Sequence, residues 1–474
     1  MICRIFPFMR QTVFLFVVAL WVLPTWAQLR LPQYQSSQLP NGVKVIVMPK
    51  RDVPLVTLKV LVKGGGEADP ADKAGLADVT NDLMLRGTTK RSATEIADQL
   101  DFLGASISTS SDYASNTVTL EVLSKDVATG VEILADIVLQ ANFPKDEVAK
   151  ELASALDSAK SLKDSPQAAV HSYATKYFFN QAGHPYGKVA DETTLARIFR
   201  DDIVSFHKRY YVGANMTVIA VGDFESEAMQ RTISEAFAKA PKGTAFQAIG
   251  ELKLSRESEP RMLFINDAQA TQTQFYIMQP GISIRNPDRI AVMLVNTLFG
   301  GRFTSMLNDA LRVNAGLTYG ATSSVQERQL EGMLAISTFT ATKTTEQAID
   351  MALDVLKTLR EKGINAEQLE SAKAYVKGGM PTKLLETNDQ LASLLAKFEI
   401  NGLDSSEVDT LFQRIDAVSV EDANRVIERY YRADNLTFVL LGQYEAIGKQ
   451  VLSKYAKEPV VVELRSPGLP VSAQ

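Results

Sequence analysis

The stretch Tyr210-Tyr-Val-Gly-Ala-Asn-Met-Thr217 returns in the same chain as Tyr430-Tyr-Arg-Ala-Asp-Asn-Leu-Thr437. Each copy continues into a short apolar run that ends at a glycine, and an acidic helix start precedes both copies in the same register, at Asp201 and at Glu421. Chance supplies a pair of tyrosines readily but not a repeat of this length. The sequence therefore predicts two related halves.

Apolar periodicity around the repeat indicates both strands and helices. Residues 42–47, 55–62 and 118–122 alternate apolar and polar side chains in part or throughout, which is typical of strands with one buried face. Ser92-Ala-Thr-Glu95 is a capping box. We expect it to open a helix that ends at Gly104.

The apolar runs of the repeat, residues 217–222 and 437–442, are typical of short buried strands. Strands interleaved with helices in this way favour an antiparallel-rich sheet with helices packed on one face. We therefore expect an α+β fold of two related halves, each built as such a sheet. The halves should span residues 28–240 and 261–474, because residues 241–260 have the composition of a linker.

Residues 1–27 have the features of a secretory signal peptide. They carry Arg4 and Arg10, then an apolar run over residues 13–23, and we expect cleavage after Ala27. The run is too short to span a bilayer comfortably, so an uncleaved anchor is the less favoured alternative. We expect export across the inner membrane to the periplasm, with no stable membrane span in the mature chain.

Composition excludes several classes of function. The single cysteine, Cys3, lies in the segment expected to be removed, so the mature chain would hold no disulfide, thiol nucleophile or cysteine metal site. A formal net charge of −5 without a block of basic residues gives no footing for nucleic acid. The chain also lacks the Gly-x-Ser-x-Gly elbow of many serine hydrolases.

The segment Gly75-Leu-Ala-Asp-Val-Thr-Asn-Asp-Leu-Met84 predicts an amphipathic helix. In one interpretation its leucines and valine are buried and Asp78 and Asp82 form the solvated face. In another, Asp78 and Asp82 share a face and bind a hard cation such as calcium or magnesium, although such ions usually take more oxygen ligands. The chain holds three histidines, at 171, 184 and 207, and none lies four residues from another. A zinc site with two histidines on one helix is therefore impossible.

A second segment, Phe299-Gly-Gly-Arg-Phe-Thr-Ser305, is followed by Leu311-Arg-Val-Asn-Ala-Gly-Leu-Thr-Tyr319. It places Arg312 and Tyr319 seven residues apart. A guanidinium and a phenol are donors that can polarise a carbonyl or hold an extended peptide. The alternative is structural: Arg312 ends a helix, and Tyr319 packs in a strand.

These segments, together with His184-Pro-Tyr-Gly187, resemble the insulinase (pitrilysin) family of zinc peptidases, whose inverted zinc motif reads H-x-x-E-H. Asp78, Asn81 and Asp82 stand where that motif has its first histidine, its glutamate base and its second histidine. Two aspartates are hard oxygen donors, and Asn81 has no basic atom to take a proton from water. The resemblance implies a fold of two halves around an internal chamber.

The third zinc ligand of the family is a glutamate that lies seven residues after another glutamate on a later helix. Matching Glu151 to the earlier glutamate places Ser158 at the ligand position. We therefore expect four degenerate positions, no catalytic residue, no metal and no cofactor in this chain: Asp78, Asn81, Asp82 and Ser158.

In the family, the arginine and tyrosine contact the peptide substrate and help to stabilise the oxyanion at the zinc. Arg312 and Tyr319 match that pair. Chains of this size in the family often work in pairs, one with the zinc motif and the other with the arginine and tyrosine. The resemblance thus implies a non-catalytic, substrate-binding subunit of a secreted heterodimeric zinc metallopeptidase, inactive alone, whose homologous partner subunit holds the zinc.

Two other functions remain open at this point. One is a peptide-binding or chaperone-like structural protein without proteolysis, for which no partner restores hydrolysis. The other is an autonomous metallopeptidase with an atypical metal site at Asp78 and Asp82, for which the isolated chain has metal-dependent activity.

Overall fold

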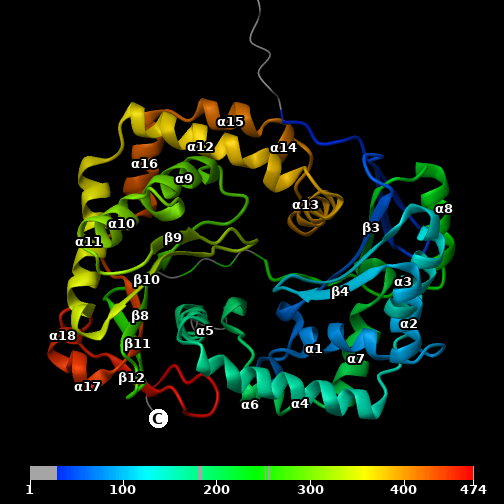
Figure 1. Ribbon diagram of the computed structural model, residues 1–474, viewed down its shortest axis with the longest axis horizontal. Coiled ribbons are helices and arrows are strands. Elements are labelled where there is room, and N and C mark those ends of the chain that lie inside the picture. The colour runs from blue at the N-terminus through cyan, green and yellow to red at the C-terminus, as the bar shows by residue number, and fades with distance from the viewer. Residues whose placement is uncertain (1–28, 180–183, 251, 253, 255–256, 473–474) are drawn as a thin grey trace, which may run out of the picture.

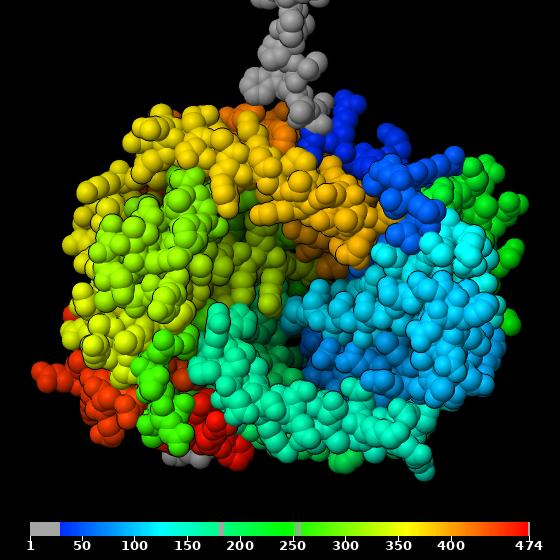
Figure 2. All heavy atoms as spheres, in the orientation of Figure 1, coloured from blue at the N-terminus to red at the C-terminus, as the bar shows by residue number. Residues whose placement is uncertain are grey.

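A computed structural model describes residues 29–179, 184–250, 252, 254 and 257–472. The signal peptide expected at residues 1–27 lies outside the described residues. Figure 1 shows the N-terminal half on the right and the C-terminal half on the left, and the surface in Figure 2 is hollowed between them.

Each half contains a six-stranded sheet of mixed but mainly antiparallel pairing. The N-terminal sheet has the order β1-β2-β6-β3-β5-β4 and the C-terminal sheet the order β12-β7-β11-β8-β10-β9. The N-terminal strands are β1 (Gln35–Gln38), β2 (Lys44–Pro49), β3 (Leu55–Lys63), β4 (Ser106–Ser111), β5 (Ser115–Leu123) and β6 (Met216–Gly222). The C-terminal strands are β7 (Arg261–Asn266), β8 (Gln272–Pro280), β9 (Ala321–Val325), β10 (Met333–Ala341), β11 (Thr437–Gly442) and β12 (Val460–Glu463).

The sequence repeat occupies the same place in both sheets. Strand β6 lies parallel to β2 and antiparallel to β3, and β11 lies parallel to β7 and antiparallel to β8. The second tyrosine of each copy is buried: Tyr211 donates a hydrogen bond to Asn81 Oδ1 (3.2 Å) and Tyr431 to the carbonyl oxygen of Val292 (3.3 Å). The prediction of two related α+β halves is confirmed.

The helices of the N-terminal half are α1 (Leu76–Leu83), α2 (Ala93–Leu103), α3 (Val127–Gln140), α4 (Lys145–Ser161), α5 (Pro166–Phe179), α6 (Glu192–Leu195), α7 (Arg200–Tyr210) and α8 (Ser226–Phe237). Those of the C-terminal half are α9 (Arg289–Asn296), α10 (Met306–Asn308), α11 (Thr345–Lys362), α12 (Ala366–Leu384), α13 (Asn388–Asn401), α14 (Ser406–Asp409), α15 (Leu411–Ala417), α16 (Val420–Tyr430), α17 (Tyr444–Ile447) and α18 (Lys449–Ser453). Helix α2 begins with the predicted capping box at Ser92 and ends at Gly104 in the left-handed conformation.

The two halves exchange helices. Helix α5 of the N-terminal half packs on β8 and β11 of the C-terminal sheet, and α13 of the C-terminal half packs on β3 and β6 of the N-terminal sheet. The sequence predicted helices on one face of each sheet, but the central strands are buried along nearly their whole length and need cover on both faces. The second cover comes from the other half.

The two exchanged helices are held differently. Buried apolar and aromatic residues of α5, such as Tyr173 and Phe178, share a core with the C-terminal sheet. Helix α13 adds ion pairs: Glu399 lies 2.6 Å from the Lys44 ammonium and 3.1 Å from that of Lys63. The apolar contacts of α5 and the ion pairs of α13 both hold the two halves together.

The ends of the described chain cross between the halves as well. Near the N-terminus, Leu31 is buried in the C-terminal core and its N–H donates to Asp409 (2.9 Å). Near the C-terminus, the Leu469 N–H donates to Asp191 of the N-terminal half (3.1 Å).

One stretch of the described residues, Arg289–Asn314, is long and apolar enough to cross a membrane. It lies within the C-terminal half, and 61% of its most apolar part is buried there, as for the core helix of a soluble protein.

Candidate functional site

Helix α1 carries the segment that resembles the zinc motif. Its apolar residues are buried in the N-terminal core, as the sequence pattern predicted: Leu76, Val79 and Leu83. Asp69 fixes the start of the helix, because its carboxylate accepts hydrogen bonds from the N–H groups of Gly75 (2.7 Å) and Ala77 (2.8 Å). Gly75 has a φ of 100°, a conformation that favours glycine.

Asn81, at the position of the family's glutamate base, is a structural residue. Its side chain is fully buried, and its Nδ2 donates to the carbonyl oxygens of Ser110 (2.9 Å) and Thr117 (3.2 Å). Its Oδ1 accepts the hydrogen bond from Tyr211. Asn81 therefore joins α1 to strands β4 and β5 and to the repeat, and its amide is not available to a ligand.

The two aspartates lie on the side of α1 that faces away from the N-terminal core. Solvent reaches Asp78, while Asp82 is half-buried and accepts a hydrogen bond from the Thr109 hydroxyl (2.5 Å). Desolvation raises the pKa of Asp78, and the negative charges of Asp82 and Glu151 add to this rise against a hydrogen bond from Ser111. The carboxylates of Asp78, Asp82 and Glu151 therefore repel one another on this side of the helix.

The remaining degenerate position, Ser158, is exposed on α4. Glu151, about two turns earlier on the same face, forms an ion pair with Arg86 (3.2 Å). Among the residues that the structure describes, no three histidine, cysteine, aspartate or glutamate side chains converge as metal ligands would. Hard oxygen donors and a buried amide do not fit a catalytic zinc ion, which prefers imidazole or thiolate ligands.

Asp69 and the lysine beside it were not found by sequence reasoning. Burial raises the pKa of Asp69 to about 7, although the hydrogen bonds from Gly75 and Ala77 and the charge of Lys188 oppose the shift. The Lys188 ammonium donates to the carbonyl oxygens of Glu67 (2.9 Å) and Asp69 (2.8 Å). An Asp-Pro turn shortly before the motif was the only sequence signal for this cap.

The second candidate pair lies on the C-terminal half. Arg312 belongs to a π-helical turn (η9, Asp309–Asn314), and its guanidinium lies 4.5 Å from the centre of the Phe303 ring. In the part of the chain that the structure describes, no carboxylate pairs with Arg312. Its donors therefore remain free while the aromatic ring holds the side chain in place.

Tyr319 is 81% exposed and lies outside a strand, since β9 begins only at Ala321. The structural alternative is therefore wrong in placing Tyr319 in a strand, although Arg312 does lie in the last turn of a helix, as that alternative predicted. Three more large hydrophobic residues are exposed on the same segments and on α12: Phe303, Val313 and Tyr375. The Arg302 guanidinium lies 5.9 Å from the Tyr375 ring. Exposed tyrosine and phenylalanine rings that contact arginine guanidinium groups are typical of binding surfaces.

The two candidate sites belong to opposite halves of the molecule. Figure 1 shows α1 in the right-hand half and α10, which leads into the turn of Arg312, in the left-hand half. The structure thus places the degenerate motif in one half and Arg312 and Tyr319 in the other. It also brings Arg312 into contact with Phe303, which sequence reasoning missed.

Two of the three histidines, His184 and His207, pack against aromatic rings. His184 stacks on Phe179 with a ring separation of 4.9 Å, and its Nδ1 accepts from the Tyr186 N–H (3.2 Å). His207 stacks on Tyr211 at 4.6 Å.

The fold, together with the segment of α1 that resembles the zinc motif, defines a metallopeptidase-like protein. Two models of one family match the chain: "Insulinase (Peptidase family M16)" matches residues 44–187, and "Peptidase M16 inactive domain" matches residues 197–376. The chain belongs to the insulinase, or M16, family.

Similar sequences include an uncharacterized zinc protease of Mycobacterium bovis, 24% identical over 83% of this chain and 89% of the relative. The uncharacterized zinc protease YmxG of Bacillus subtilis is 22% identical over 83% of this chain and 95% of its own length.

Similar solved structures support the fold. A peptidase M16 inactive domain from Pseudomonas fluorescens has a TM-score of 0.80 at 22% identity, covering 87% of this chain and 98% of that chain. The first half of the periplasmic protease PqqL from Escherichia coli has a TM-score of 0.71 at 18% identity, covering 91% of this chain and 98% of that one.

Proposed function

We propose that this protein is the non-catalytic, substrate-binding subunit of a heterodimeric zinc metallopeptidase that acts on peptides in the periplasm. Arg312 and Tyr319 contact the peptide, and a homologous partner chain holds the zinc.

The observation that carries the proposal is the state of Arg312. Among the described residues it has no acidic partner, yet its guanidinium stacks on the Phe303 ring, and Tyr319, seven residues further along the chain, is exposed. A guanidinium that is oriented but not neutralised is suited to hydrogen-bond peptide carbonyls or a developing oxyanion. Orientation before binding also lowers the entropy lost when the substrate docks.

Helix α1 supports the same assignment, because it lacks the residues of a hydrolytic zinc site. A hydrolytic zinc site needs neutral imidazoles, a base and an open coordination position. This chain offers Asp78 and Asp82, and its Asn81 is engaged with the backbone of β4 and β5. In the proposed complex the zinc and the base come from the partner chain.

The N-terminal sequence supports a periplasmic site of action. Residues 1–27 have the sequence of a signal peptide, and the mature chain would lack cysteine. One structural neighbour, the PqqL protease, is periplasmic.

The test is peptide hydrolysis by the purified mature chain, alone and mixed with a homologous chain that has an intact H-x-x-E-H motif and comes from the same genome. We expect this chain alone to be inactive and free of zinc, and the mixture to cleave. Arg312→Ala and Tyr319→Phe should each lower the rate of the mixture.

Matched controls separate substrate contact from general damage. Arg51→Ala removes an exposed arginine that pairs with Glu225 on the N-terminal half, and Tyr444→Phe removes the hydroxyl of a half-buried tyrosine at the start of α17. Both should leave the rate unchanged. Metal-dependent cleavage by the isolated chain contradicts the proposal in favour of an autonomous enzyme, and a mixture that binds peptides without cleaving them favours the chaperone-like alternative.

A further inference from the structure

The C-terminal sheet continues from Tyr319 into a polar surface that the proposed function does not use. On β10, Phe339 and Ser337 lie on the face opposite to Ile336, which is buried in the C-terminal core. The rings of Tyr319 and Phe339 are 6.4 Å apart. Helix α5 packs on the same face over β8 and β11, and Figure 1 shows it between the two halves. Ser337 therefore lies on the α5 side of the sheet, two residues along β10 from the residue that contacts Tyr319.

Three hydroxyl groups form a row across the strands at this point: Tyr276 on β8, Ser337 on β10 and Thr322 on β9. Thr322 Oγ1 lies 3.0 Å from Ser337 Oγ, and Ser337 hydrogen-bonds the Tyr276 phenol. The phenol oxygen lies 3.2 Å from Nδ1 of His171 on α5. Thr322 and His171 are exposed, while Ser337 and Tyr276 are half-buried. Solvent thus reaches both ends of this hydroxyl row.

His171 ends the hydroxyl row as a neutral imidazole. Desolvation lowers its pKa, and the positive charge of Arg328 lowers it further. Burial raises the pKa of Tyr276 against the hydrogen bond from Ser337, so the phenol keeps its proton. When the phenol donates that proton to Nδ1, the imidazole carries its own proton on Nε2. The exposed His171 then offers an N–H donor to a ligand.

Arg328 lies in the loop between β9 and β10 and has no carboxylate partner among the described residues. Its guanidinium lies 4.8 Å from the centre of the Tyr186 ring, a contact that holds it in place. The acidic residues beside it in the sequence are engaged elsewhere: Glu327 pairs with Arg289 (3.5 Å), and Glu331 accepts a backbone N–H (3.2 Å). The positive charge that acts on His171 is therefore not matched by an ion pair.

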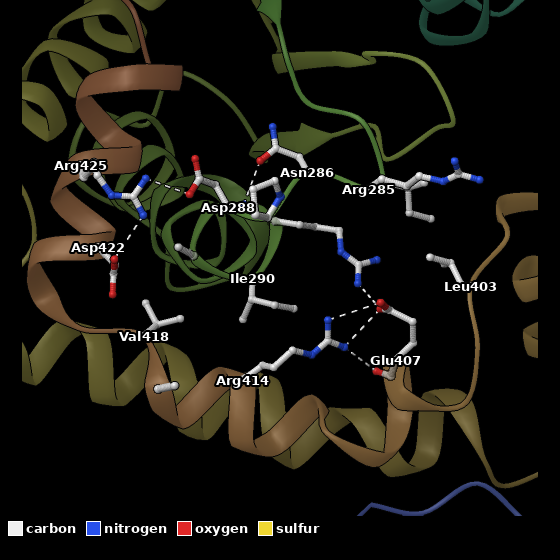
Figure 3. Close-up of a pocket in the computed structure, with 15 residues that line it drawn as sticks. Arg285, Asn286, Asp288, Ile290, Leu403, Glu407, Arg414, Val418, Asp422 and Arg425 are labelled. Atoms are coloured by element: carbon white, nitrogen blue, oxygen red, sulfur yellow. Dashed lines mark hydrogen bonds and ion pairs between the residues drawn. The ribbon is translucent and has the colours of Figure 1, made fainter. Parts of the chain in front are cut away.

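The arginines around the largest pocket of the C-terminal helices are in a different state. This pocket has a volume of about 480 Å³ and lies between the start of α9 and helices α14, α15 and α16. Its carboxylates Glu407 and Asp288 each pair with two arginines, and Figure 3 shows the contacts with Arg414 and Arg425. Charge in that pocket is matched within the chain, whereas the charge of Arg328 is not.

We propose that His171, at the end of the hydroxyl row, binds a carboxylate of the peptide substrate, either an aspartate or glutamate side chain or the C-terminal carboxylate. The Nε2–H of His171 donates to a carboxylate oxygen, the hydroxyl row fixes the tautomer and orientation of the ring, and Arg328 supplies the attractive charge. The inference rests on the proposed function, because it concerns the peptide that Arg312 and Tyr319 contact. It adds a preference for acidic substrates.

The position of His171 sets which carboxylate it can reach. From Phe339 to Tyr276 the sheet spans about 7 Å along the strands and about 5 Å across them. An extended peptide covers this distance, and the further step to His171, with about three or four residues. The carboxylate should therefore lie about three or four residues from the peptide residue that contacts Tyr319.

The first test measures peptide binding by the isolated mature chain, which needs neither zinc nor a partner. The probes are alanine decapeptides with a rhodamine at the N-terminus, an amide at the C-terminus and one phenylalanine. Each carries one glutamate three or four positions before or after the phenylalanine and has a counterpart with glutamine. We expect one glutamate peptide to bind about tenfold more tightly than its counterpart in fluorescence anisotropy.

A second set of peptides separates the two sources of the carboxylate. These peptides end three or four residues after the phenylalanine, with a free carboxylate or with an amide. A tenfold preference for the free acid in this set, without a preference for glutamate in the first, assigns the site to the C-terminal carboxylate. Equal binding within every pair overturns the inference and leaves the proposed function standing, whereas the absence of any peptide binding contradicts both.

Variants assign the preference to these residues. His171→Ala and Arg328→Gln should each reduce the tenfold preference to about twofold or less without changing the affinity for the neutral counterpart. Arg328→Lys keeps the charge and should keep most of the preference. The control is Arg209→Gln, which removes a guanidinium that lies 5.2 Å from the ring centre of Tyr210 on the other half. A preference that survives both His171→Ala and Arg328→Gln overturns the inference.

A measurement on the unaltered chain covers the case in which a variant does not fold. The chain has three histidines, so labelled imidazoles give few NMR signals. The preferred acidic peptide should raise the pKa of His171, because a nearby carboxylate favours the charged imidazole, while its neutral counterpart should not. The signals of His184 and His207 should stay fixed. An unchanged His171 pKa with the acidic peptide bound contradicts the assignment.

Discussion

Helix α1 and the turn that carries Arg312 come from related halves, yet their polar side chains are in opposite states. On α1, Asn81 is buried. Its amide nitrogen donates hydrogen bonds to β4 and β5, and its amide oxygen accepts one from Tyr211. At the turn, Arg312 rests on an aromatic ring and Tyr319 is exposed. A polar group that the fold itself satisfies supports the fold, whereas one that is oriented and left unpaired is available to a ligand.

The largest expected effect on stability is that of Asn81→Ala. The change removes the hydrogen bonds that the buried Asn81 makes with the carbonyl oxygens of Ser110 and Thr117 and with the buried Tyr211 hydroxyl, and we expect a loss of about 3 kcal/mol in the free energy of unfolding. Urea unfolding followed by circular dichroism measures it. Asn314→Ala, at an exposed asparagine, is the control and should change stability by less than about 0.5 kcal/mol. Equal stability of both variants would show that Asn81 is not structural.

Arg312→Ala should give the reverse pattern. We expect the rate of the two-chain mixture to fall by about 100-fold, the usual scale for removing one donor to a developing oxyanion, with the free energy of unfolding unchanged. Steady-state hydrolysis and urea unfolding on the same preparation separate the two quantities. A variant that loses stability but keeps its rate would show that Arg312 supports the fold and does not contact the substrate.

Acid titration compares carboxylates in the same way. Asp191 is buried between the Lys176 ammonium (2.8 Å) and the Leu469 N–H. Burial would raise its pKa, but the hydrogen bonds from Lys176 and Thr193 outweigh burial and lower it to about 2. Because the folded-state pKa is depressed, this stabilisation is present above the ordinary pKa near 4 and is lost as the pH falls toward 2.

Asp191→Asn should therefore cost about 2 kcal/mol at pH 7 and much less at pH 2. Unfolding by urea across this pH range measures the difference between the variant and the unaltered chain. A difference that does not depend on pH would mean that the Asp191 charge does not hold the C-terminal segment.

Asp78→Asn should give the smallest effect, with the opposite sign. Desolvation and the charges of Asp82 and Glu151 raise the pKa of Asp78, so its ionised form opposes folding above its ordinary pKa. Because solvent reaches this side chain, we expect a gain of only about 0.5 kcal/mol at pH 7, which disappears as the pH falls below the ordinary pKa. If the variant instead loses stability at neutral pH, Asp78 has a cationic partner, such as a bound metal ion.

The sequence predicted what depends on local pattern. The repeat at Tyr210 and Tyr430, the strands on either side and the capping box at Ser92 all appear where expected. Each of these follows from residues a few positions apart.

The sequence could not show contacts that depend on distant segments. The partners of Asn81 lie on β4, β5 and the repeat, so its role follows only from the folded chain. Helix α5 gave no sign that it covers the sheet of the other half, because an apolar helix face does not name its partner. The stacking of Arg312 on Phe303 likewise needs a turn that only the structure shows.

The most direct test of the central claim, that Arg312 and Tyr319 and not α1 contact the substrate, is photo-crosslinking within the two-chain mixture. Benzoylphenylalanine replaces Tyr319 in one sample, Asp78 in a second and the 90% exposed Phe102 of α2 in a third, and a slowly cleaved peptide is added before irradiation. We predict that the peptide becomes attached at position 319 well above the level at 78 and 102. Attachment at position 78 with none at 319 would contradict the account.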